Sequence, residues 1–166
     1  MKTFVCQSCG QPVFFENTRC TRCGAGLGFL PDQMRLSALV DAGDGIWTAA
    51  PSSPSTRARP PGFFARLFRK RPPASNSAPC ATRHYRKCLN YTEHDVCNWM
   101  VPADDPAVLC IACAPNRTVP NLGRPGNLEK WARIERGKRR LAYGLLRLGL
   151  PVETRQQNPE QGLAFD

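Results

Sequence analysis

The sequence of 166 residues has no apolar run long enough to cross a membrane, because the run near the C-terminus, residues 141–146, ends at Arg147. No apolar stretch precedes Cys6, so we expect no secretory signal and a cytoplasmic protein. Histidine is scarce: only His84 and His94 occur, and neither is followed by glutamate. The sequence therefore lacks the His-Glu-x-x-His arrangement that holds the catalytic zinc of metalloproteases.

Acidic residues are also few, 13 against 23 lysines and arginines, which gives a formal charge of +10. Residues 51–79 hold six basic side chains and no acidic one, and residues 126–150 hold seven against two. The basic excess therefore lies in one spacer and one predicted helix. Such segments can bind nucleic acid or an anionic membrane surface, but a basic face is more often simply solvated.

Cysteine, in contrast, occurs nine times. Residues 6–10 and 20–24 are two Cys-x-x-Cys-Gly turns, in which both thiolates can face one ion and glycine can adopt the left-handed conformation that closes the turn. With a predicted strand over residues 11–17 between them, the turns have the layout of a zinc ribbon. Its ligands would be Cys6, Cys9, Cys20 and Cys23.

This first cluster favours structural zinc over other uses of paired cysteines. Iron can bind the same four thiolates, whereas a thioredoxin-type pair would stand at the start of a helix and a disulfide framework would accompany secretion. A module of about thirty residues buries too little surface to fold alone, and zinc binding supplies the missing stability. Four thiolates leave no open position for a catalytic water.

A β-hairpin is predicted next, with strands at residues 34–40 and 46–48 around a turn at residues 41–45. Leu36, Ala38 and Val40 alternate with other residues, which predicts a half-buried strand. From residue 51 to residue 79 the chain holds seven prolines and five serines, which predicts a disordered linker. Within it, residues 62–71 combine Phe and Arg and could form a peg for a membrane surface or an acidic partner, or simply a solvated insertion.

The second cysteine cluster predicts another closed site. Cys110 and Cys113 form a third Cys-x-x-Cys turn, and their partners would be Cys88 and Cys97. His94 is the rival ligand, because His-x-x-Cys has the same spacing as the turns. We rank the set of four cysteines first, which leaves Cys80 as a free thiol.

A long helix is predicted at residues 126–150, with Asn127 as a candidate N-cap and with Gly149 and Pro151 after the last turn. Its apolar residues recur at helical spacing and predict one buried stripe, whereas the arginines lie largely off it. The stripe consists of Leu128, Trp131, Ile134, Leu141, Leu145 and Leu148. We expect it to cover the second cysteine module, a further domain or a protein partner.

Six segments together resemble a bacterial family described as putative zinc-binding metallopeptidases, which begin with a zinc-ribbon domain. They are residues 4–10, 12–20, 27–31, 93–99, 116–120 and 141–150. In that family, a passage similar to residues 162–166 leads into a region with His-Glu-x-x-His, whereas this sequence stops there. The resemblance implies the accessory region of such a protein, whose protease part is separate or lost.

The sequence therefore predicts a small, metal-stabilised α+β protein with two structural zinc ions and no catalysis of its own. The predicted order is a zinc ribbon and hairpin (1–50), a linker (51–79), a second Cys-rich zinc lobe (80–125), an amphipathic helix (126–150) and a tail (151–166). Its function would be to scaffold a protein partner or the missing protease domain through helix residues 128–148. The alternatives are a nucleic-acid-binding zinc ribbon and a membrane-surface adaptor that uses the Phe/Arg peg.

Overall fold

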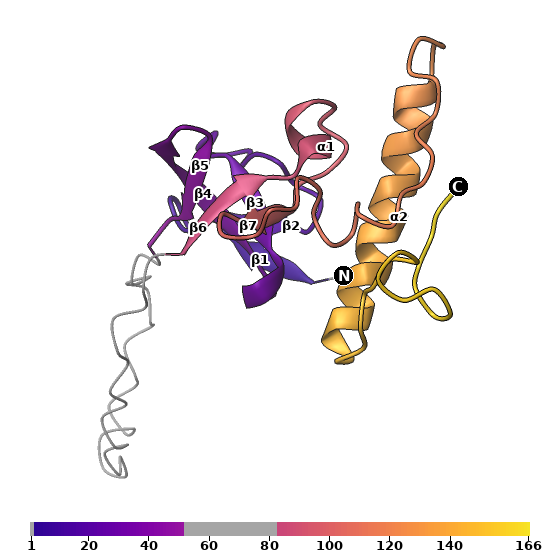
Figure 1. Cartoon of the computed structure of the whole chain (residues 1–166). Helices are drawn as coiled ribbons and strands as arrows, with labels where there is room; N and C mark the ends of the chain where they lie inside the picture. Colours follow the sequence, from indigo (N-terminus) through magenta and orange to yellow (C-terminus); the bar gives the residue numbers. More distant parts are fainter. Residues whose placement is uncertain (1, 52–82) are drawn as a thin grey trace, which may run out of the picture.

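The computed structural model describes residues 2–51 and 83–166, so the predicted linker and its Phe/Arg peg lie outside the described residues. A two-stranded ribbon joins β1 (Thr3–Val5) to β2 (Pro12–Phe14). An antiparallel five-stranded sheet then follows the chain in the order β3-β4-β5-β6-β7 (Figure 1). Its strands are β3 (Leu27–Leu30), β4 (Arg35–Gly43), β5 (Ile46–Ala49), β6 (His84–Lys87) and β7 (Met100–Pro102). The helical elements are η1 (Pro31–Gln33), α1 (Leu89–Thr92) and α2 (Asn127–Arg147), and the fold class predicted from the sequence is confirmed.

The predicted hairpin is present as β4 and β5. Asp44 (φ 53°) and Gly45 (φ 73°) both adopt left-handed conformations between the paired residues Gly43 and Ile46. Two successive left-handed residues define the tight turn whose twist matches that of antiparallel strands, and Asp-Gly is a favoured sequence for it.

The predicted alternation along this strand is wrong. Residues 36–39 are all buried, whereas Val40 is 47% exposed. The cause is that the first ribbon also contacts this strand: the Gln7 side-chain oxygen accepts hydrogen bonds from the Ala38 N–H (2.6 Å) and the Ser37 hydroxyl (3.4 Å). A strand covered on both faces loses its period of two.

The segments on either side of the undescribed residues share the five-stranded sheet. Strand β5 pairs with β6 across the undescribed segment, with Trp47 opposite Tyr85. The sheet also curls, because the Phe29 N–H of β3 donates to the carbonyl of Asn98, two residues before β7 (2.7 Å). The two modules therefore fold around a common centre.

That centre is a cluster of aromatic rings from four parts of the chain. Phe29 of β3 packs on Trp99 beside the second cysteine group, with ring centroids 4.6 Å apart. Phe15, next to β2, lies 5.1 Å from Phe29 and 5.1 Å from Tyr143 of α2. The first ribbon, the sheet, the second cysteine module and the long helix thus meet in one apolar core.

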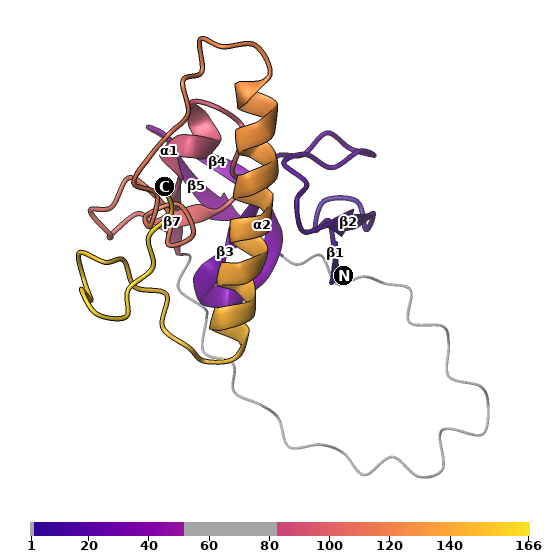
Figure 2. The ribbon, with the colours of Figure 1, turned by 90° about the vertical axis from the view of Figure 1, so that its right-hand side faces the viewer.

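Helix α2 lies along one side of the strands, and the tail folds back beside it (Figures 1 and 2). The residue before the helix is Gly126 in a left-handed conformation, so Asn127 is the first helical residue rather than the N-cap. At the other end Gly149 is left-handed (φ 70°), and the Leu150 N–H donates to the Leu145 carbonyl, which is the glycine-terminated ending of many helices.

The buried face of α2 differs from the predicted apolar stripe. Leu128, Ile134, Leu141 and Leu148 are between 41% and 75% exposed. The buried residues are Trp131, Glu135, Lys138, Arg139 and Ala142. The helix is thus rotated about its axis relative to the prediction, and three charged side chains face the interior. Within the described residues, no helix is long and apolar enough to span a membrane.

Gly28 allows close packing inside the sheet. A Cβ atom at this position would lie 2.6 Å from Met100 Sδ and 2.7 Å from its Cγ, whereas a Cβ at Gly26 would meet no atom within 4 Å. We therefore expect Gly28→Ala to destabilise the zinc-loaded protein by about 1–3 kcal/mol through overpacking. Gly26→Ala is the matched control and should leave the unfolding midpoint in denaturant near that of the wild type. Equal midpoints for the two variants would refute this packing account.

Candidate metal centres

The first candidate metal centre joins the two turns of the N-terminal ribbon. Its four sulfurs, from Cys6, Cys9, Cys20 and Cys23, all lie within 4.8 Å of one another. The Cys6–Cys23 and Cys9–Cys20 sulfur pairs are 3.7 and 3.6 Å apart. Four sulfurs bound tetrahedrally at about 2.3 Å from zinc would be about 3.8 Å apart, so this group fits one zinc ion.

The backbone of the two turns is nearly identical. The Gly10 N–H donates to the Cys6 carbonyl (2.8 Å) and the Gly24 N–H to the Cys20 carbonyl (2.9 Å). Both glycines are left-handed, with φ of 75° and 73°, as the sequence predicted. The backbone N–H of Cys23 lowers the pKa of the Cys20 thiol to about 6, which favours the thiolate that zinc requires.

The second candidate metal centre collects cysteines from three separate places. Cys88 follows β6, Cys97 precedes β7, and Cys110 and Cys113 form the third turn, with all four sulfurs within 4.8 Å. Cys97 and Cys110 have sulfurs 3.7 Å apart, and the Cys110 N–H donates to the Cys88 sulfur (3.3 Å). This group also fits one zinc ion, although Cys88 and Cys110 are 22 positions apart in the sequence.

The two centres differ in exposure. Cys23 is exposed and Cys9 half-buried in the first, whereas all four cysteines of the second are buried. Burial raises the pKa of the Cys110 thiol. Hydrogen bonds lower the pKa of the Cys88 thiol, and the bond from the Cys110 thiol contributes most. A metal entering the second centre must displace protons from such thiols, so acid opposes its binding.

The two histidines stand apart from both groups. His94 is half-buried with its ring 5.3 Å from that of Trp131, and His84 is an exposed residue of β6. Among the described residues, the potential metal groups are these two sets of four cysteines. Cys80 lies outside the described part of the chain.

Sequence reasoning missed a buried polar network beside the second centre. The Glu135 carboxylate accepts hydrogen bonds at Oε1 from Trp131 Nε1 (2.8 Å), Asn116 Nδ2 (2.9 Å) and Lys138 Nζ (2.8 Å). Its Oε2 lies 3.7 Å from Cys113 Sγ. The only sequence signal was the i, i+3 spacing of Glu135 and Lys138, which exposed helices share.

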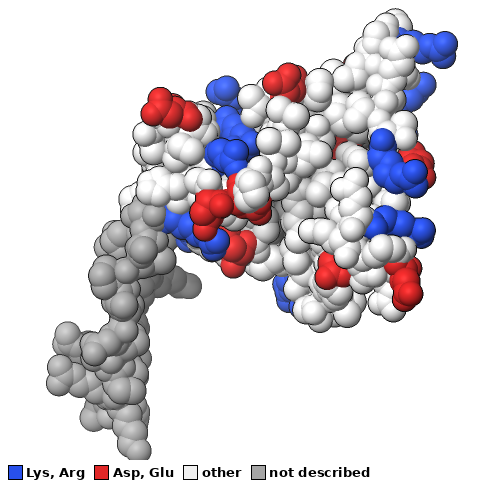
Figure 3. Space-filling model, viewed as in Figure 1, with Lys and Arg blue, Asp and Glu red and all other residues white. Residues whose placement is uncertain are grey.

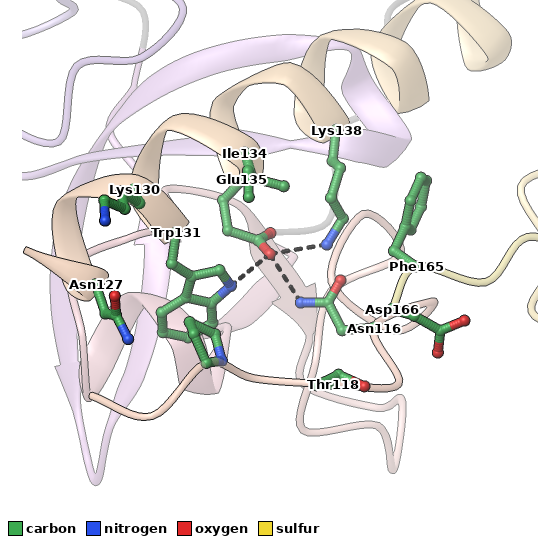
Figure 4. A pocket seen from close by; sticks show the side chains of 11 residues that line it. Asn116, Thr118, Asn127, Lys130, Trp131, Ile134, Glu135, Lys138, Phe165 and Asp166 are labelled. Atoms are coloured by element: carbon green, nitrogen blue, oxygen red, sulfur yellow. Dashed lines mark hydrogen bonds and ion pairs between the residues drawn. The ribbon is translucent and has the colours of Figure 1, made fainter. Parts of the chain in front are cut away.

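The same network forms the floor of a pocket of about 240 Å³ between α2 and the end of the tail (Figure 4). Trp131, Ile134 and Phe165 are among its lining residues, and the Lys138 ammonium lies 4.8 Å from the Phe165 ring. The tail is held there by backbone hydrogen bonds from Phe165 N–H to the Pro115 carbonyl and from Arg117 N–H to the Phe165 carbonyl, both 2.9 Å.

The surface charges give no single dominant patch on the face drawn in Figure 3, where basic and acidic side chains are interspersed with uncharged areas. Some basic residues of α2 are engaged within the described structure: Arg140 pairs with Glu16 at 2.6 Å, and Lys138 pairs with Glu135. The charge on this helix therefore serves its packing as well as its surface.

The two centres should release zinc to a chelator at different rates. Because Cys23 is exposed whereas all four ligands of the second centre are buried, we expect two kinetic phases in a chromogenic chelator assay. The Cys23→Ser variant should lose the fast phase and keep the slow one. Release in one phase, or loss of the slow phase in Cys23→Ser, would show that exposure does not control lability.

Metal stoichiometry tests the ligand sets directly. Native mass spectrometry should find two zinc ions in the wild type and in His94→Ala, but one in Cys88→Ser, because Cys88 lies within the sulfur group and His94 does not. Cys97→Ser should also hold one. A variant set in which His94→Ala loses an ion while Cys88→Ser keeps both would overturn the assignment.

Comparison with known proteins agrees with this geometry. A model of the zinc-ribbon domain matches residues 3–59 and 67–124, and a model described as "Putative zinc-binding metallo-peptidase" matches residues 127–166. The resemblance predicted from the sequence is confirmed. No solved structure matches the chain.

Similar proteins occur in mycobacteria. An uncharacterized protein of Mycobacterium bovis is 32% identical over 165 residues, which is 99% of this chain. Uncharacterized proteins from two strains of Mycobacterium tuberculosis match to the same extent. The chain spans about a third of the length of these relatives (36%). Since the zinc-ribbon model matches more than half of its length and includes both cysteine groups, the chain belongs to the zinc-ribbon domain family, and its last forty residues match the zinc-binding metallopeptidase family.

Proposed function

We propose that this chain is a non-catalytic, zinc-stabilised accessory module that holds a metallopeptidase domain through helix α2. The observation that carries the proposal is the closure of both metal centres. Each ion would be surrounded by four cysteine sulfurs, so that no coordination position is left for a water or a substrate carbonyl. Zinc in these centres would supply folding stability, and hydrolysis would require a different site.

The sequence supports the absence of a peptidase site in this chain. Its two histidines are followed by Tyr85 and Asp95, so no His-Glu-x-x-His occurs. Residues 127–166 nevertheless match a peptidase family, which associates the helix and tail with such a domain. The mycobacterial relatives are almost three times as long as this chain, so they have room for one. An accessory role combines these two observations.

Helix α2 offers the surface for that contact. Ile134, Leu141 and Leu148 lie on one side of the helix and are 60%, 46% and 75% exposed. Ile134 also lines the pocket beside Trp131 and Phe165 (Figure 4). An exposed apolar ridge that ends in a pocket suits an apolar segment of a partner protein, since burial of such surface drives association. We propose that the partner is the peptidase domain.

The peptidase part of the proposal predicts a negative result with a clear control. The purified, zinc-loaded chain should not cleave a mixed peptide library, with or without added zinc, because both centres are closed. Cleavage by the pure chain that a chelator abolishes would contradict the non-catalytic role. A zinc protease of known activity in the same buffer serves as the positive control.

The docking part predicts binding to the portion of the Mycobacterium bovis relative that this chain does not match. Ile134→Glu and Leu141→Glu should each weaken the complex by about tenfold or more, because a charge would be buried in an apolar contact. Val40→Glu is the matched control, an exposed apolar residue on β4, and should bind like the wild type. No measurable complex, or equal weakening by Val40→Glu, would refute docking through α2.

A further inference from the structure

The second metal centre extends beyond the segment that the zinc-ribbon model matches. That match ends at residue 124, whereas the side chains of α2 begin at residue 127. Two of them reach the centre: Glu135 Oε2 lies 3.7 Å from Cys113 Sγ, and the Arg139 guanidinium donates to the carbonyl of Val96, the residue before Cys97. Residues from the peptidase-family segment therefore contact a metal site of the zinc-ribbon segment.

Hydrogen bonds from both the cysteine loop and helix α2 hold the Glu135 carboxylate in place. Asn116, which donates to Glu135, belongs to the loop after the third cysteine turn, and its backbone N–H donates to the Cys113 carbonyl (3.0 Å). From the helix, Trp131 and Lys138 donate to the same carboxylate oxygen. The carboxylate consequently links the helix to the loop that carries Cys113.

Burial makes the charges of this face energetically important. Glu135 is 1% exposed, Lys138 7% and Arg139 3%. Lys138 pairs with Glu135, which leaves Arg139 as a buried cation without an ion pair among the described residues. A buried charge without a counter-charge costs several kcal/mol, so an opposite charge nearby is expected.

The metal-loaded centre would supply that opposite charge. Four thiolates around one divalent zinc ion carry a net charge of about −2. The buried side chains of α2 add one negative and two positive charges, a net charge of about +1 beside it. The loaded centre and the helix face are thus complementary in charge.

We propose that α2 completes the second metal centre, so that Lys138 and Arg139 raise its zinc affinity and the bound ion in turn holds α2 in place. Glu135 acts in the opposite direction, because its carboxylate faces the Cys113 thiolate while it positions Lys138. The coupling is reciprocal, since any interaction that favours the loaded state from the helix also favours the docked helix from the metal. This inference rests on the proposed function for its consequence: zinc in the second centre would control the surface offered to the peptidase domain.

The test uses zinc competition on the full chain, with the first centre as an internal control for folding. Lys138→Met and Arg139→Met should weaken zinc binding at the second centre by about tenfold or more, the usual cost of losing a partner around a metal site. Arg136→Met changes an exposed arginine of the same helix and should leave the affinity unchanged. Glu135→Gln should raise the affinity, because it removes a negative charge and keeps the shape.

The double variant Glu135→Gln/Lys138→Met separates charge from simple disruption. It leaves the net charge unchanged, so its zinc affinity should return to within about threefold of the wild type. If Glu135→Gln lowers the affinity and the double variant is the weakest of all, the side chains matter only for packing and the proposal fails. The same holds if Lys138→Met and Arg139→Met bind zinc like Arg136→Met.

Hydrogen exchange tests the reciprocal half of the coupling. Cys97→Ser should empty the second centre and speed amide exchange across residues 127–147, while β1 and β2 at the first centre stay protected. Unchanged protection of α2 would contradict the coupling. Because these measurements use the chain alone, they can fail or succeed independently of binding to a peptidase domain.

Discussion

Coordination of zinc by cysteine thiolates is the constraint on which this structure depends. The strands of the first ribbon are three residues each, and the third cysteine turn lies in a segment with no strand of its own after β7. Such short elements bury little surface, and a four-sulfur site replaces the missing core by fixing two loops at one point. The aromatic cluster around Phe29 then joins the two metal-stabilised parts.

Local chemistry was predictable from the sequence, whereas tertiary contacts were not. The cysteine turns and the Asp44-Gly45 turn are encoded within a few residues, so their geometry follows from spacing and glycine conformation. The helix was predictable from its period, but its buried face was not, because Glu135 and Arg139 are buried by partners distant in sequence, Asn116 and Val96. Charged residues in an apolar pattern are ordinarily assigned to the solvent face.

This placement of charge connects the metal chemistry to the proposed role. A helix with a purely apolar buried face would dock whether or not zinc was bound. Glu135, Lys138 and Arg139 are buried beside a cysteine centre, so under the proposed coupling the docking of α2 would depend on the charge of that centre. Beside this buried face, Ile134 and Leu141 are exposed, and the proposed partner would bind there. The zinc-ribbon segment and the peptidase-family segment thus pack together as one folded unit.

Both metal centres are assigned as closed sites with sulfur ligands alone. X-ray absorption at the zinc edge of the fully loaded chain measures this directly, because sulfur and nitrogen or oxygen ligands lie at different distances. We expect a single shell of about four sulfurs at about 2.3 Å from zinc. A shorter shell of nitrogen or oxygen at about 2.0–2.1 Å would show a histidine or water ligand and contradict the assignment of a purely structural role.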